Sequence, residues 1–322
     1  MKPQDDFRLL VHTPAELATE YVAWVERIKA DPGIAFGVDT IDRRVIPMRP
    51  GDLVSLIARP GHGKSSLLAY FAREHAKRIV ERGAHETEAV VYVTWEASAE
   101  ELEAFFQAGD DYSTSDVAWG RVDIDAVKRK AVKRAGVPIW VIGHGIGRAG
   151  QKAPQMTPSA VLSAIETMHA DFGVKPALML FDYMQLIPVP GYQDRVQRVT
   201  EVPIKIKELA LRIGCPAVVG VQAGREVDKR NEKIPTMQDA QWASSIEQTS
   251  DKVFGLWRPC LTEPPNSHIE IEGVEGMFPV NERLMVIRLL KQRFEKGRFT
   301  WAMYFAPEYL KLAEMEMRRV EL

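Results

Sequence analysis

A glycine-rich stretch that ends in a lysine and two serines carries the clearest chemistry in this sequence. It follows the apolar run 53–57 and precedes the helix-like run 67–71, so a strand, a loop and a helix come in succession. Glycines let the backbone N–H groups of such a loop point at phosphate oxygens, and the helix N-terminus adds a positive dipole. The pattern predicts a phosphate-binding loop for a nucleotide such as ATP. Its residues are Ala58, Arg59, Pro60, Gly61, His62, Gly63, Lys64, Ser65 and Ser66, with alanine in place of the usual first glycine.

Lys64 is predicted to reach the β- and γ-phosphates, and Ser65 to ligate Mg²⁺. Hydrolysis also needs an acid that orients the metal and a group that positions water. Asp182 ends the apolar run 178–181, and we interpret it as the metal-orienting acid. Glu96 follows the run 89–93, and its carboxylate is predicted to polarise the attacking water. Gln222 ends the run 218–221, where it is either a sensor of the γ-phosphate or an ordinary polar residue at a strand end.

Two further cations flank Gln292 at the end of a later apolar run. Lys291 and Arg293 are separated by one residue, so in an extended chain they point the same way. They face either a phosphate, including one bound by another subunit, or solvent.

The elements that must position these residues alternate between strand and helix. Near-continuous apolar runs separated by helical segments indicate an α/β fold with a mainly parallel sheet covered on both faces. The runs are 53–57, 89–93, 139–142, 178–181, 217–221, 253–257, 284–290 and 300–305. Helical segments are expected around 65–81, 98–108, 124–135, 158–172 and 197–213. The later runs lie closer together and suggest an antiparallel edge, while 143–154 and 259–282 are expected to be surface loops.

A short amphipathic helix is predicted ahead of this pattern, over 13–30. Thr13 and Glu16 form a capping box with proline between them, and Asp31-Pro32-Gly33 ends the helix. Its apolar stripe must be buried on its own core or on a neighbouring subunit. The stripe consists of Leu17, Tyr21, Trp24 and Ile28.

The composition limits the binding partners and the cellular compartment that can be expected. The 322 residues contain 42 Lys and Arg against 44 Asp and Glu, a formal net charge of −2, so any contact with nucleic acid must be local. The two cysteines, Cys215 and Cys260, lack metal-ligand spacing, which argues against zinc and a disulfide framework. We expect a cytoplasmic protein with no membrane partner, because no signal peptide or long apolar span is present.

Together these motifs resemble the C-terminal ATPase domain of DnaB-family replicative helicases, within the RecA-like class. The resemblance covers about residues 13–310. It is carried by ARPGHGKSS at 58–66, by VYVTWEAS around Glu96, by LFDYMQLI around Asp182 and by VQAGREVDKR around Gln222. SSIEQTSDKVFGLWR, KQR at 291–293 and FAPEY at 305–309 continue the series in the family's order.

The resemblance implies a RecA-like domain over 36–322, preceded by a tail and linker helix over 1–35. It implies a ring of six subunits with ATP and Mg²⁺ at each interface, Lys291 and Arg293 acting on a neighbour's γ-phosphate, and Arg225 beside the sensor Gln222. Translocation on single-stranded DNA, with 5′→3′ unwinding and replication proteins as partners, follows from the same likeness. Arg195 and Arg198 lie in the first DNA-binding loop that the family pattern implies.

Two departures from the family keep a second function open. Residues 1–12 leave no room for the family's N-terminal collar domain, and Gln241-Trp242-Ala243-Ser244 stands where the family has Arg-Glu-Ser-Gly. Trp242 would either stack on a base there or serve in packing. The alternative to a DNA-translocating motor is a RecA-like regulatory or scaffolding ATPase that uses nucleotide for assembly without unwinding.

Overall fold

The structure is a computed structural model. It describes residues 8, 11–109, 111–148, 150–151, 153–191, 195–240, 243–295 and 297–315, and for 195–199 it describes the backbone only.

A nine-stranded sheet organises the fold, in the order β11-β10-β9-β6-β1-β5-β4-β2-β3. The six strands β1 to β6 run parallel to one another, and β9, β10 and β11 are antiparallel. This confirms the predicted mainly parallel sheet with an antiparallel edge. The strands of the sheet are β1 Leu53–Ala58, β2 Glu88–Thr94, β3 Ile139–Ile142, β4 Lys175–Asp182, β5 Ala217–Gln222, β6 Lys252–Trp257, β9 Leu284–Gln292, β10 Phe299–Ala306 and β11 Lys311–Glu314.

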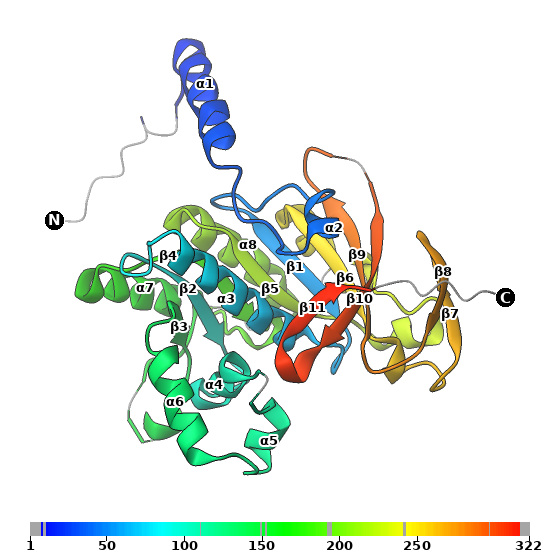
Figure 1. The fold of residues 1–322 in the computed structure, drawn as a ribbon. Helices are drawn as coiled ribbons and strands as arrows, with labels where there is room; N and C mark the ends of the chain where they lie inside the picture. The colour runs from blue at the N-terminus through cyan, green and yellow to red at the C-terminus, as the bar shows by residue number, and fades with distance from the viewer. Residues whose placement is uncertain are drawn as a thin grey trace.

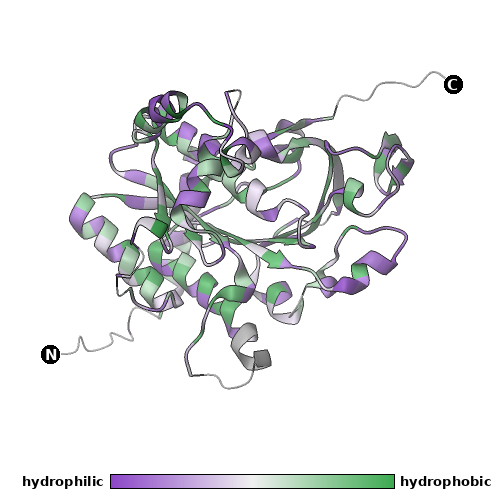
Figure 2. Ribbon diagram, turned by 90° about the horizontal axis from the view of Figure 1, so that it is seen from below, coloured by the Kyte–Doolittle hydropathy of each residue, from purple (hydrophilic) through white to green (hydrophobic). Residues whose placement is uncertain are grey.

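The central strands are mostly apolar and are buried along most of their length because both faces of the sheet are covered (Figure 1). In β1 every residue is buried. Val54 and Leu56 pack in the core beneath α3 (Lys64–Glu81), whereas Leu53 and Ile57 pack in the core beneath α7 (Pro158–Phe172) and α8 (Arg195–Ile213). In Figure 2 the sheet is mostly green, and the surrounding helices mix green with purple.

The remaining helices complete these two layers. On the face of α3, α4 packs against α3 and α6 packs against α4, while α9 packs against α8 on the other face. The short α2, α5 and α9 were not predicted. Their bounds are α2 Asp39–Asp42, α4 Ala99–Gln107, α5 Thr114–Ala118, α6 Ile124–Arg134 and α9 Ala243–Thr249.

The predicted N-terminal helix is α1, Pro14–Ala30, with the capping box of Thr13 and Glu16 in place. It projects from the body of the molecule (Figure 1), and none of its residues is buried. Its contact with the body includes Trp24, whose ring lies 5.9 Å from the Arg49 guanidinium. Tyr21 is 63% exposed and Leu17 52%, so the apolar stripe faces solvent within this single chain.

One loop prediction was wrong. Residues 259–282, expected to be a surface loop, contain the hairpin β7 (His268–Ile271) and β8 (Val274–Pro279). The hairpin is mostly exposed and rich in glutamate and glycine, so it lacks the apolar run that marks a buried strand.

Within the described part of the chain, none of the helices combines the length and the apolar character needed to span a lipid bilayer.

Candidate active site

Four adjacent strands bring the predicted catalytic groups to one edge of the sheet. In the order β1-β5-β4-β2, these parallel strands end at Ala58, Gln222, Asp182 and Thr94. Parallel strands present their carboxyl ends at the same edge, which is where open α/β sheets bind ligands. The phosphate-binding loop, Asp182, Glu96 and Gln222 therefore meet, although they are far apart in the sequence.

The predicted phosphate-binding loop connects β1 directly to α3, whose first residue is Lys64. Gly61 and Gly63 have φ of +79° and +86°, a conformation that side chains disfavour. A Cβ atom on Gly63 would also lie 2.9 Å from Cε1 of the buried Phe305. Both geometry and space therefore require glycine at this position, where the loop turns into the helix N-terminus.

Lys64 is surrounded by the two predicted acids. Burial lowers the pKa of its ammonium group, while the carboxylates of Asp182 and Glu96 act in the opposite direction. Burial and the charge of Asp182 raise the pKa of Glu96, and Lys64 opposes them. Glu96 itself is exposed at the surface. The three side chains thus form one electrostatic group in which each charge acts on the other two.

Asp182 has one oxygen paired and one without a partner. Tyr92, from the neighbouring strand β2, donates a hydrogen bond of 2.9 Å to Oδ2. Among the described residues no hydrogen-bond partner lies at Oδ1, although this atom is buried. Burial raises the pKa of Asp182, and the Ser65 and Tyr92 hydroxyls and Lys64 oppose that rise. A buried, unsatisfied carboxylate oxygen close to a serine hydroxyl fits the ligand set of a magnesium ion, which prefers oxygen ligands and retains water.

Gln222 is held through its backbone by a residue that sequence reasoning missed. The side-chain amide of Gln185 accepts from the N–H of Gln222 at 3.2 Å and donates to its carbonyl oxygen at 3.3 Å. Gln185 belongs to the LFDYMQLI motif, so the motif offered a signal that a strand-end analysis does not use. Arg225, the first residue of the 3₁₀ segment Arg225–Lys229, is exposed near the same strand end.

Two side chains of the phosphate-binding loop anchor it to neighbouring strands. The guanidinium of Arg59 donates to both oxygens of Asp228 at 3.2 and 3.0 Å, and to the Ala223 carbonyl at 3.1 Å. His62 is 4% exposed, and its Nδ1 accepts from the backbone N–H of Arg258 at 3.0 Å. Burial lowers the pKa of His62 to about 4, which keeps the ring neutral. The sequence did not reveal either partner, because both follow other strands.

Lys291 and Arg293 lie at the opposite end of the strands from the candidate active site. Strand β9 is antiparallel to β6 and pairs Gln292 with Lys252, the first residue of β6. The two cations therefore lie near the start of the parallel strands, about 20 Å from the phosphate-binding loop by the length of six strand residues. The structure does not bring them to the candidate active site of the same chain.

The predicted DNA-binding residues are only partly described. Arg195 and Arg198, expected in a loop, lie in the first turns of α8, which starts at Arg195. Trp242 lies outside the described residues.

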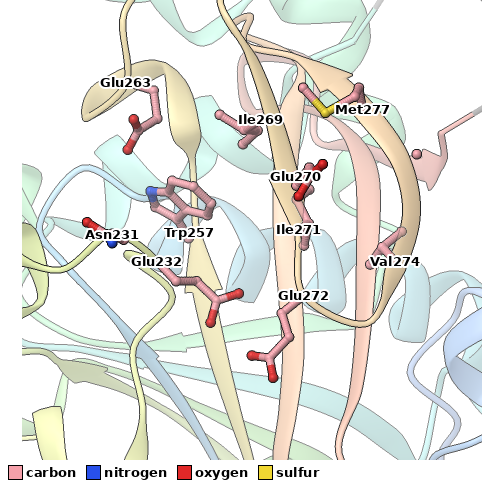
Figure 3. Close-up of a pocket in the computed structure, with 11 residues that line it drawn as sticks. Asn231, Glu232, Trp257, Glu263, Ile269, Glu270, Ile271, Glu272, Val274 and Met277 are labelled. Atoms are coloured by element: carbon pink, nitrogen blue, oxygen red, sulfur yellow. The ribbon is translucent and has the colours of Figure 1, made fainter.

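A cavity of about 760 Å³ lies away from the predicted site, between the end of β6 and the β7–β8 hairpin (Figure 3). Its lining carries Glu232, Glu263, Glu270 and Glu272 and none of the predicted site residues. Because it holds neither the phosphate-binding loop nor the acids that surround Lys64, this cavity is not a second candidate for the nucleotide site.

Comparison with known proteins identifies the relatives of this chain. The sequence profile described as the DnaB-like helicase C terminal domain matches residues 33–314. A replicative DNA helicase DnaB of Pasteurella multocida is 25% identical over 278 residues, which cover 83% of this chain and 54% of the relative. A second, from Haemophilus influenzae, is 24% identical over 308 residues, covering 92% and 60%. The chain thus spans little more than half the length of these curated relatives.

Two solved structures share the fold. A DnaB-like replicative helicase, solved in a study of its interactions with primase, superposes with a TM-score of 0.72 at 17% identity, covering 98% of this chain and 69% of the other. A separately solved ATPase domain superposes with a TM-score of 0.73 at 17% identity, covering 94% of this chain and 100% of the other. The predicted RecA-like ATPase fold is therefore confirmed.

Proposed function

Because this chain belongs to the DnaB-like helicase C-terminal domain family, we propose that it is an ATP-hydrolysing, ring-forming motor that translocates on single-stranded DNA and unwinds duplex DNA. The observation that carries the proposal is the convergence of Lys64, Asp182, Glu96 and Gln222 at the carboxyl edge of four adjacent strands. The competing regulatory or scaffolding role rested on the altered second loop and the short segment ahead of the linker helix. Family membership does not favour it.

We assign residues 58–66 to the phosphates of ATP, with Lys64 on the β- and γ-phosphates. Ser65 and Asp182 would hold the magnesium ion, and the unpaired Oδ1 of Asp182 supports that role. When bound, Mg²⁺ neutralises charge that develops on the transferred phosphoryl group. Tyr92 fixes the other oxygen of Asp182 and so orients the carboxylate.

Glu96 is assigned to the attacking water. Its raised pKa makes the ionised carboxylate a stronger base than an ordinary glutamate, and its exposure leaves it accessible to water. We assign Gln222 to sensing of the γ-phosphate with help from Arg225, because it ends β5, the strand between β1 and β4. The backbone clamp by Gln185 supports a fixed position for this sensor.

Lys291 and Arg293 are assigned to the γ-phosphate of a neighbouring subunit. Their place at the far edge of the sheet argues against action within the same chain. The exposed apolar stripe of α1 supports assembly, because fully burying each large side chain is worth roughly 1.5–3 kcal/mol. A ring of six, with residues 1–35 as tail and linker helix and 36–322 as the motor domain, follows the family pattern.

Single-stranded DNA is assigned to the start of α8, which carries Arg195 and Arg198. With a formal net charge of −2, the chain must bind DNA through a local patch repeated around the ring. Binding is expected to weaken with salt and to depend little on sequence. Trp242 remains a candidate for base stacking. The 5′→3′ polarity, the partnership with replication proteins and the cytoplasmic location also stand as proposals.

The proposal is tested by the ATPase rate with and without oligo-dT, together with unwinding of a forked duplex. We expect DNA-stimulated hydrolysis and unwinding, both lost in Lys64→Ala. Glu96→Gln should bind nucleotide yet turn over about 10²–10⁴-fold more slowly. Arg195→Ala combined with Arg198→Ala should weaken DNA binding while basal hydrolysis persists. Hydrolysis without unwinding, and with no DNA binding at low salt, would instead favour the regulatory ATPase.

A further inference from the structure

Both cations, Lys291 and Arg293, are held by the short segment that ends α9 and leads into β6. The Lys291 ammonium donates to the Ser250 carbonyl at 2.6 Å and to the Glu247 carbonyl. The backbone N–H of Arg293 donates to the Asp251 carbonyl at 2.9 Å, and its guanidinium lies 3.3 Å from Oδ1 of Asp251. The same segment thus fixes both residues, but by different means.

The Asp251 side chain is held in place by contacts other than the one with Arg293. Its side chain is 6% exposed, and its Oδ2 accepts from the backbone N–H of Leu53 at 2.8 Å and from the Lys207 ammonium at 2.5 Å. Burial alone would raise the pKa of Asp251, but Lys207, the Leu53 N–H and Arg293 outweigh it and lower the pKa, so the carboxylate is charged at neutral pH. One oxygen is therefore tied to β1 and α8, and the other faces Arg293.

The Arg293 guanidinium is largely exposed although it contacts Asp251. The Arg293 side chain is 66% exposed, and its contact with Asp251 uses one nitrogen. Lys291 directs its charge at two carbonyl oxygens of its own chain. A single-nitrogen contact at 3.3 Å from a largely exposed guanidinium is weak, so a triphosphate can draw the guanidinium away from Asp251. The pair nevertheless restricts a long side chain with many rotamers.

We propose that Asp251 is a positioning residue for Arg293, holding its guanidinium ready at the surface for the nucleotide of the neighbouring subunit. The inference rests on the proposed action of Arg293 across an interface. It adds a residue outside the cation pair that sets the position of one of its members.

The first test compares Asp251→Asn with a matched control, Asp52→Asn. The amide at 251 still accepts from the Leu53 N–H but loses the charge that faces Arg293. Asp52 lies at the same edge and pairs with the buried Lys252 at 2.6 Å, without contacting Arg293 in the structure. We expect Asp251→Asn to lower kcat by up to about a hundredfold, with the KM for ATP unchanged, because misplacing a catalytic group by about 1 Å costs that much. An unchanged kcat, or an equal loss in Asp52→Asn, would overturn the proposal.

The second test uses mixed assemblies, with subunit exchange verified by native mass spectrometry. Asp251→Asn mixed with Glu96→Gln should recover activity, because some interfaces then join an intact Glu96 to an intact Asp251 and Arg293. Asp251→Asn mixed with Arg293→Ala should not recover, because every interface lacks a competent cation. The reverse pattern would place Asp251 in support of its own nucleotide site through Leu53 and refute the inference.

Two controls keep these outcomes interpretable. Arg293→Ala mixed with Glu96→Gln tests the interface assignment alone, so a failure there contradicts the proposed function rather than the role of Asp251. If Asp251→Asn does not fold, the double variant Lys207→Met with Asp251→Asn removes the buried charge pair as a unit, which proteins tolerate better than an unpaired charge. The same mixing pattern is expected from it.

Discussion

Acidification should destabilise this fold through His62, a residue of the phosphate-binding loop. Its Nδ1 accepts from the backbone N–H of Arg258, which follows β6, so the ring must be neutral at that nitrogen. The pKa of His62 is about 4 in the folded chain against an ordinary value of 6.5, mainly because the ring is buried. The folded-state pKa lies below the unfolded one. The stabilisation is therefore complete above pH 6.5 and is lost as the pH falls through about 4.

The size of the effect follows from these two values. Complete protonation corresponds to about 3 kcal/mol of unfolding free energy, of which about 2 kcal/mol is lost between about pH 7.5 and about pH 5. His75, buried in α3 with a pKa lowered to about 3, contributes in the same direction. Both histidines therefore contribute to the pH dependence of the parent protein's stability. A variant is needed to separate their contributions.

His62→Asn keeps a hydrogen-bond acceptor near the position of Nδ1 but cannot be protonated. Urea unfolding at about pH 7.5 and about pH 5, at equal protein concentration and without nucleotide, should show the parent losing about 2 kcal/mol more than the variant. The absolute stability of the variant is immaterial, since the readout is its pH dependence. Equal pH dependence in the two proteins would refute the view that the loop is anchored by a neutral, buried histidine.

Three further changes test other contacts. Gly63→Ala should lower stability by at least about 1 kcal/mol, because of the positive φ and the nearby Phe305, and should abolish ATP binding measured by fluorescence titration. The control Gly83→Ala changes a glycine that also has a positive φ but has open space around it. It should lose less stability and bind ATP normally. Gln185→Leu should lower kcat more than it changes KM and cost about 1–3 kcal/mol in urea unfolding, since two hydrogen bonds to Gln222 disappear. Deleting residues 1–31 should leave a folded core that forms smaller species in light scattering, and an unchanged oligomer would show that surfaces other than α1 hold the assembly together.

Much of the sheet could be predicted from the sequence because its strands are buried on both faces. The eight apolar runs correspond to eight of the nine strands of the large sheet, including β3, predicted and observed over 139–142. The exceptions are exposed: β11 and the β7–β8 hairpin carry too little apolar surface to give a continuous run. The start of α8 was also placed too late, since Arg195 was expected in a loop and lies in the helix.

The candidate site was predictable where a polar residue directly follows a buried strand, as Asp182 and Gln222 do. Its supporting residues were not. Tyr92 is one of several residues in an apolar strand, and only the pairing of β2 with β4 shows that its hydroxyl reaches Asp182. Likewise, the relation of Asp251 to Arg293 depends on the antiparallel register of β6 and β9, which the sequence does not state.

The two strands that border the large sheet also bear on how copies of this protein associate. Both β3 and β11 have only four residues, and two of the four in β11 are the exposed charged residues Lys311 and Glu314. Such short strands offer few free N–H and C=O groups to an incoming strand, and the charges on β11 oppose pairing further. Growth by strand addition into fibres is thereby discouraged. Contact between copies is left to surfaces such as the projecting helix, whose docking can close into an assembly of finite size.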